Sequence, residues 1–128
     1  MASSPAPFSR TSLRRRLDHV GIALAGLCAV HCLATLLIVS ALGLGSHFLL
    51  AESIHRTGLA LAVLVAAVAI GWGFVRHRLI APLVIAGAGI ALMAAALLVE
   101  HGTGELLLTL AGVALVSGGH ILNLRAAR

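Results

Sequence analysis

The stretch Val20–Leu44, VGIALAGLCAVHCLATLLIVSALGL, decides the fold of this chain. It is an almost unbroken apolar run, longer than the roughly 20 residues that a helix needs to cross the hydrocarbon core of a bilayer. Within it, Cys28, His31 and Cys32 are spaced i, i+3 and i+4, which places them on one face of a helix. Because ionisable side chains are costly in hydrocarbon, this triplet predicts a function at that face.

The composition of the whole chain predicts an integral membrane protein, whose helices contact the lipid bilayer. The 128 residues are 60% hydrophobic and only 10% charged, against about 25% charged in soluble domains. The net charge of +5 comes entirely from arginine, and most arginines flank apolar runs. Such residues are typical topology signals of membrane proteins, so we predict no nucleic-acid partner.

Three further apolar runs predict an all-α, four-helix transmembrane bundle. The expected plan is a basic cytoplasmic segment 1–17, a four-transmembrane-helix domain 18–124 with spans at about 18–42, 54–75, 79–99 and 105–124, and a cytoplasmic tail 125–128. Pro82 falls in the first turn of the third span, where its missing N–H costs nothing. Every arginine except Arg56 lies on the side of the chain ends, so both termini are predicted to be cytoplasmic.

The Cys28, His31 and Cys32 triplet is open to three interpretations: metal or metalloid binding, a structural role, and redox chemistry. A disulfide is disfavoured because Cβ atoms at i and i+4 are about 5–6 Å apart, whereas a disulfide needs about 3.5–4.5 Å. Redox pairs usually have the spacing C-x-x-C. We favour metal binding, with both cysteines as thiolates and His31 as a third donor.

Other polar residues of the apolar regions extend this hypothesis along the chain. His120, after two glycines in the fourth span, is either a candidate ligand near the cytoplasm or an interfacial histidine bonded to lipid headgroups. Asp18 is either a helix cap or, as an alternative to His120, a metal ligand at the cytoplasmic exit. His77, between two arginines, is interpreted as a turn residue. Six side chains on the outer side form either a capture site for a divalent cation or an ordinary solvated loop: His47, Glu52, His55, Glu100, His101 and Glu105.

The chain resembles the MerC-type mercury-resistance membrane protein family. The resemblance rests on the segment Leu27–Leu33, LCAVHCL, in the first of four helices, on His77-Arg78 after the second, and on the predicted cytoplasmic ends. It extends from about Asp18 to Leu124. It implies a multi-pass protein of the bacterial inner membrane that takes up mercuric ion, with Cys28 and Cys32 relaying the metal.

Two features differ from the family's pattern and widen the choice of metal. The first-helix pair is C-x-x-x-C with an inserted histidine, whereas the family uses C-x-x-C, and the chain has no second cysteine pair. A site of sulfur and nitrogen donors also suits zinc or copper. The substrate is therefore expected to be a divalent ion, with mercury first and zinc or copper as alternatives.

Two functions remain open at this level. The first is a metal-ion uptake transporter, expected to be a homo-oligomer because four helices line a path poorly. The second is a membrane metal-binding or sensor protein that does not transport, or a small accessory subunit. No nucleotide-, phosphate- or hydrolase-type motif is present in the sequence, so no enzymatic activity is predicted.

Overall fold

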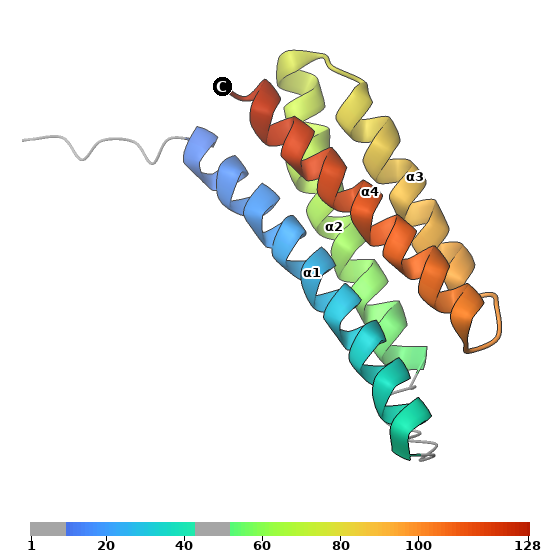
Figure 1. Ribbon diagram of the computed structural model, residues 1–128. Coiled ribbons are helices and arrows are strands. Elements are labelled where there is room, and N and C mark those ends of the chain that lie inside the picture. The colour runs from blue at the N-terminus through green and yellow to red at the C-terminus, as the bar shows by residue number, and fades with distance from the viewer. Residues whose placement is uncertain (1–9, 43–51) are drawn as a thin grey trace, which may run out of the picture.

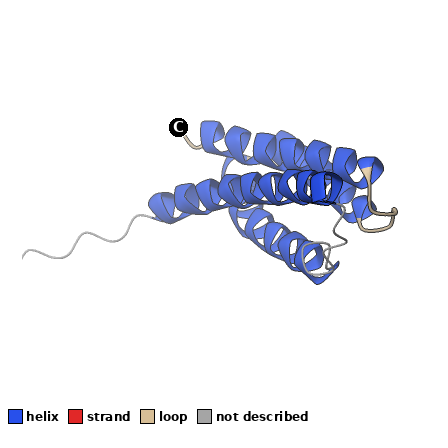
Figure 2. Ribbon diagram, turned by 60° about the horizontal axis from the view of Figure 1, so that its bottom comes forward, coloured by secondary structure: helices blue, strands red, loops and turns tan. Residues whose placement is uncertain are grey.

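The computed structural model describes residues 10–42 and 52–128, and all the regular structure in these ranges is helical (Figures 1 and 2). Four helices follow one another: α1 (Arg10–Leu42), α2 (Glu52–His77), α3 (Ala81–Ala96) and α4 (Thr103–Ala126). They pack side by side as one bundle (Figure 1). The predicted all-α, four-helix fold is confirmed.

The helix bounds differ from the predicted spans at two places. The first helix begins at Arg10 rather than near Asp18, because arginine and leucine favour helix and extend it beyond its apolar run. The third helix is shorter than expected, with 16 residues, or about 24 Å at 1.5 Å per residue. Within the described residues, three helices contain stretches long and apolar enough to cross a membrane: Ser12–Ile38, Ser53–His77 and Thr103–Ala126.

The connection between α2 and α3 explains why the third helix starts late. Arg78 has a positive φ of 57°, and its N–H donates to the carbonyl of Phe74 at 2.8 Å. This left-handed residue after the last turn is a common way for a helix to end. Pro82 then lies in the first turn of α3, as the sequence predicted.

The tightest packing in the bundle joins α3 to α4 through small residues. A Cβ atom added at Gly89 would lie 2.6 Å from the carbonyl oxygen of Gly112. One added at Gly119 would lie 2.7 Å from the Cβ of Ala86. Small residues at such positions let helix backbones approach closely, as is common in membranes. The first helix packs against α4 and α2.

The distribution of polar and apolar side chains is the one expected of a protein surrounded by lipid. Leu98 is 87% exposed and Val75 is 68% exposed, whereas Asp18, His120 and Asn123 are completely buried. Lipid tails solvate the exposed leucines and valines, so this arrangement is stable in a bilayer and would be costly in water.

The helices define two ends of the bundle. The terminal end contains Arg10 of α1 and Ala126 of α4, and the opposite end contains Leu42 of α1 and Thr103 of α4 (Figure 1). By charge the terminal end is predicted to face the cytoplasm. That orientation stays a prediction.

Candidate metal centre

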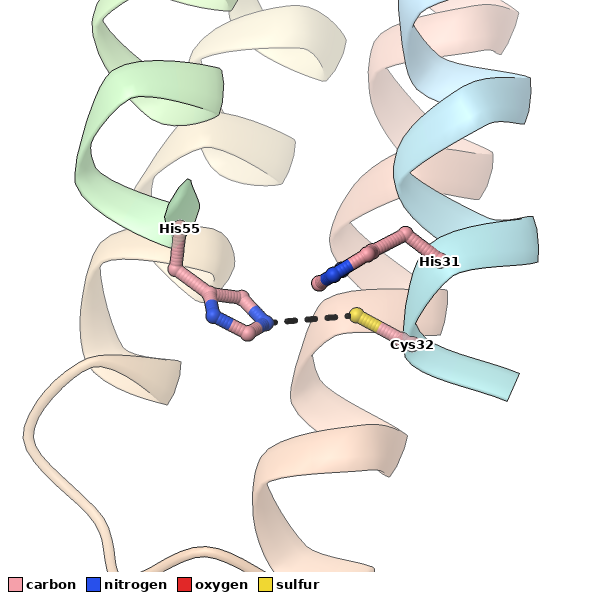
Figure 3. Close-up of side chains that lie close together, drawn as sticks. All are labelled: His31, Cys32 and His55. Carbon is pink, nitrogen blue, oxygen red and sulfur yellow. Dashed lines mark hydrogen bonds between the residues drawn. The ribbon is translucent and has the colours of Figure 1, made fainter. Parts of the chain in front are cut away.

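A cluster of potential metal ligands lies in the half of the bundle nearer the opposite end. It consists of His31 and Cys32 from α1 and His55 from the start of α2, whose side chains point toward one another (Figure 3). One ligand atom from each residue lies within 4.8 Å of the other two. The Sγ of Cys32 is 3.5 Å from the Nε2 of His55.

The local geometry of α1 directs both of its ligands toward α2. His31 and His55 approach edge to face, with ring centroids 5.4 Å apart and an interplanar angle of 64°. The hydroxyl of Thr35 donates a hydrogen bond to the carbonyl of His31 at 2.8 Å, so the Thr35 side chain has its partner within α1. The Nε2 of His31 is buried and has no hydrogen-bond partner within residues 10–42 and 52–128. A buried nitrogen of this kind is available to a ligand.

Glu105, in the first turn of α4, links this cluster to the surface. Its Oε1 is 3.7 Å from the Nε2 of His55, and its Oε2 is 2.8 Å from the Nδ1 of His101. The side chain of His101 is 51% exposed, whereas that of Glu105 is mostly covered. His101, Glu105, His55 and Cys32 therefore form a continuous row of donors from an exposed turn into the bundle.

The cluster borders an apolar cavity of about 310 Å³. Cys28, His31, Cys32, His55 and Glu105 line it, together with Met93 of α3. Cys28 is half-buried and faces α2, because a Cβ atom added at Gly58 would lie 3.5 Å from its Sγ. A neighbouring cavity of about 280 Å³ adjoins Cys32, His55, His101 and Glu105.

The donor set has the chemistry of a site for a soft or borderline divalent ion. Imidazole suits zinc and copper, and a thiolate selects for soft metals. In a tetrahedral site with bonds of about 2.0–2.3 Å, ligand atoms are about 3.3–3.8 Å apart. The Cys32–His55 distance falls in this range, and the remaining pairs of ligand atoms lie within 4.8 Å.

The structure brings together only part of the predicted ligand set. His31, Cys32 and His55 form the cluster, and His101 reaches it through Glu105. Cys28 is outside the group of three and lines the adjoining cavity. His47 lies outside the described residues.

Asp18 and His120 lie in a second polar site, near the terminal end. The Nδ1 of His120 is 2.8 Å from the Oδ1 of Asp18. The Nδ2 of Asn123 donates to Oδ1 and Oδ2 of Asp18 at 3.0 and 2.9 Å, and to the carbonyl of Ala69 at 3.1 Å. The Nε2 of His77 is 2.9 Å from the Oδ1 of Asn123. We call the four side chains of Asp18, His120, Asn123 and His77 the inner network.

Hydrogen-bond donors and acceptors are assigned consistently along the inner network. The N–H of Leu79 donates to the Nδ1 of His77 at 3.1 Å, so the Nε2 of a neutral His77 carries the proton and donates to Asn123. This fixes the amide of Asn123 with its NH₂ toward Asp18. The carboxylate of Asp18 then accepts from both Asn123 and His120. Two predictions from the sequence are therefore wrong. Asp18 lies inside α1 and does not cap this helix, and His77 is not simply a turn residue, because its side chain hydrogen-bonds Asn123.

Three functional candidates were missed or undervalued at the level of sequence. Asn123 had no assigned role, although an amide in an apolar helix was a usable signal. Glu105 was grouped with the outer loop, whereas its side chain is mostly covered and contacts His55. Met93, the thioether that lines the cavity beside Cys28, was indistinguishable from an ordinary core residue.

The apolar helices and the partly buried His–Cys cluster define a multi-pass membrane protein with a candidate metal centre. A family model described as MerC mercury resistance protein matches residues 18–125. The chain therefore belongs to the MerC mercury resistance family, as its sequence suggested. Neither the curated proteins nor the solved structures contain a match.

Proposed function

We propose that this protein binds mercuric ion, or another soft or borderline divalent ion, within the membrane and carries it across. The observation that supports this most directly is the cluster of His31, Cys32 and His55, whose ligand atoms lie within 4.8 Å of one another. Glu105 is the proposed fourth ligand, because its Oε1 is 3.7 Å from the Nε2 of His55. Ionisable residues at such depth commonly mark ion pathways.

The proposed path begins at the exposed His101 and follows the row of donors inward. Glu105 attracts the cation, His55 and Cys32 take it from Glu105, and His31 completes the nitrogen and sulfur set. Cys28 then receives the ion as a thiolate. It is one helical turn from Cys32, about 6 Å along the axis, and both cysteines line the same cavity. This retains the predicted relay between the two cysteines and adds His55 and Glu105 to it.

Mercury is the proposed physiological substrate because the family is a mercury-resistance family. Thiolates select for soft metals, and the two cysteines supply two of them. The two imidazoles and the carboxylate also suit zinc or copper. In this proposal the ion moves toward the cytoplasm of a bacterium through a homo-oligomer in the inner membrane.

Flux into proteoliposomes tests this proposal. Purified protein would be reconstituted with a metal indicator in the lumen, and Hg²⁺, Zn²⁺, Cu²⁺ and Cd²⁺ would be added outside in turn. We expect lumenal signal for the wild type and its loss in Cys32→Ser and His55→Gln. Val30→Ala is the matched control, because Val30 lies on the same turns of α1 and is 63% exposed to lipid.

Two other results of the flux experiment would contradict the proposal. Unchanged flux in Cys32→Ser at equal reconstitution would remove Cys32 from the path. Wild-type protein that binds metal tightly but gives no lumenal signal would instead be a non-transporting binding protein, a sensor or an accessory subunit. Separate measurement of bound and lumenal metal distinguishes the two functions.

A further inference from the structure

The proposed path does not use the inner network, although this is the most completely buried polar feature of the described chain. Asp18, His120 and Asn123 are all 0% exposed. Asp18 accepts from a side chain on each of two turns of α4, at 2.8 and 2.9 Å. Burying a carboxylate among apolar helices is costly unless such bonds are made, so the arrangement requires an explanation beyond packing.

The inner network joins three helices at one level of the bundle. Asp18 ties α1 to α4 through His120 and Asn123. Asn123 ties α4 to α2 through the carbonyl of Ala69 and the imidazole of His77. While these bonds hold, the terminal ends of α1, α2 and α4 cannot separate.

Two glycines give the inner network its space. A Cβ atom added at Gly21 would overlap the imidazole of His120, with Nε2 as the nearest atom. A Cβ atom added at Gly73 would overlap the Oδ1 of Asn123. The backbones of α1 and α2 thus close directly over the polar side chains of α4. No comparable contact exists at Gly26 or Gly71, where a Cβ atom would meet nothing within 4 Å.

A buried apolar layer lies between the inner network and the candidate metal centre. Ala25, Met93, Val113 and Val116 form this layer, and Cys28 packs against it. On the other side of the network, Arg14 is buried one turn nearer the terminal end. A cation in the cavity therefore faces an apolar layer, the hydrogen-bonded inner network and a guanidinium group before the terminal end.

We infer that the inner network is the gate of the transport path at the terminal end. In the structure this gate is closed, while the cavity of about 280 Å³ beside the metal centre adjoins the exposed His101 at the opposite end. Release of the ion toward the terminal end requires the bonds of Asp18 to Asn123 and His120 to break. This inference rests on the proposed function, but the gate itself is tested without metal.

Cysteine accessibility tests the gate. The reporter is Cys28, kept as the single cysteine in a Cys32→Ser background and labelled by a membrane-impermeant maleimide. Sealed vesicles of both orientations are used, and protease cleavage of a terminal tag establishes which side carries the termini. With the network intact, we expect labelling from the opposite side only.

Breaking the inner network should make Cys28 accessible to the maleimide from the terminal side as well. Asp18→Asn keeps the size of the side chain but removes the charge from its hydrogen bonds, and Gly21→Ala displaces His120. The loss of one charge-assisted bond shifts a closed-to-open equilibrium by about tenfold or more. Labelling of Cys28 from the terminal side should rise by about that factor in both variants. In Gly26→Ala, the labelling should be the same as in the protein with the network intact.

Two results would overturn the gate. The first is terminal-side labelling of Cys28 with the network intact. The second is a folded Asp18→Asn or Gly21→Ala protein, monodisperse in detergent, that is still labelled only from the opposite side. If Asp18→Asn does not fold, Gly21→Ala against Gly26→Ala decides. The labelling experiment needs no metal. If the wild-type protein carries no metal into proteoliposomes but the labelling of Cys28 follows the expected pattern, the proposed function is wrong and the gate still stands.

Discussion

Replacing Gly73 by alanine should destabilise the bundle far more than the same change at Gly71, two residues away on α2. The added methyl group at position 73 would overlap the Oδ1 of Asn123, so Asn123 must leave its place. It would lose three partners: the carboxylate of Asp18, the carbonyl of Ala69 and the imidazole of His77. Side-chain hydrogen bonds in membrane proteins are worth about 0.6–1.7 kcal/mol each, which gives a loss of about 2–5 kcal/mol.

The control isolates this loss from the effect of alanine itself. Alanine favours a helix over glycine by up to about 1 kcal/mol at either position, so this gain cancels in the comparison. At Gly71 the new methyl group meets nothing within 4 Å. Unfolding by sodium dodecyl sulfate in mixed micelles, followed by circular dichroism, gives both free energies of unfolding. Equal values, within about 0.5 kcal/mol, would show that Asn123 does not hold these bonds in the membrane protein.

Two further predictions concern the metal centre. His31→Gln and His55→Gln should each weaken zinc binding by at least about tenfold. Even the loss of a residue that only hydrogen-bonds a metal ligand lowers metal affinity by about that factor. Calorimetry in detergent measures this, and unchanged affinity would remove that residue from the ligand set. Zinc affinity should also fall as the pH is lowered from about 8 to 6, because Cys32 must lose its proton and both imidazoles must be neutral to bind a metal. Calorimetry across that range would show a flat profile if these groups are not the ligands.

Hydropathy alone predicted the helices, because each span is a long apolar run bounded by charges, glycine or proline. The helical period also placed His31 and Cys32 on one face correctly. It could not show that His55 completes their cluster, because that depends on how α1 and α2 pack. For the same reason Cys28, one turn from Cys32, was expected in the ligand group but lines the cavity beside it.

The inner network was beyond prediction for a different reason. Asp18 and His120 are 102 residues apart in the chain, so each was interpreted alone, the first as a cap or exit ligand and the second as an exit ligand. The signal that existed was the pairing of polar residues with small ones. Gly21 and Gly73 leave room for His120 and Asn123, but a glycine in a membrane helix serves many purposes.

The spacing of donors along α1 links the two polar sites in mechanism. A metal ion passes between ligands when both lie within about two bond lengths, roughly 4–5 Å. Side-chain rotation can bridge the rise of about 6 Å from Cys32 to Cys28. The next buried polar residue of α1 toward the terminal end is Asp18. It is ten residues from Cys28, or about 15 Å, and its carboxylate already accepts hydrogen bonds from Asn123 and His120. Side-chain rotation cannot cover that distance, so in the proposed cycle α1 must move relative to α2 and α4. The bonds that resist this movement are those of the inner network, and the step from Cys28 inward and the opening of the gate are therefore one event.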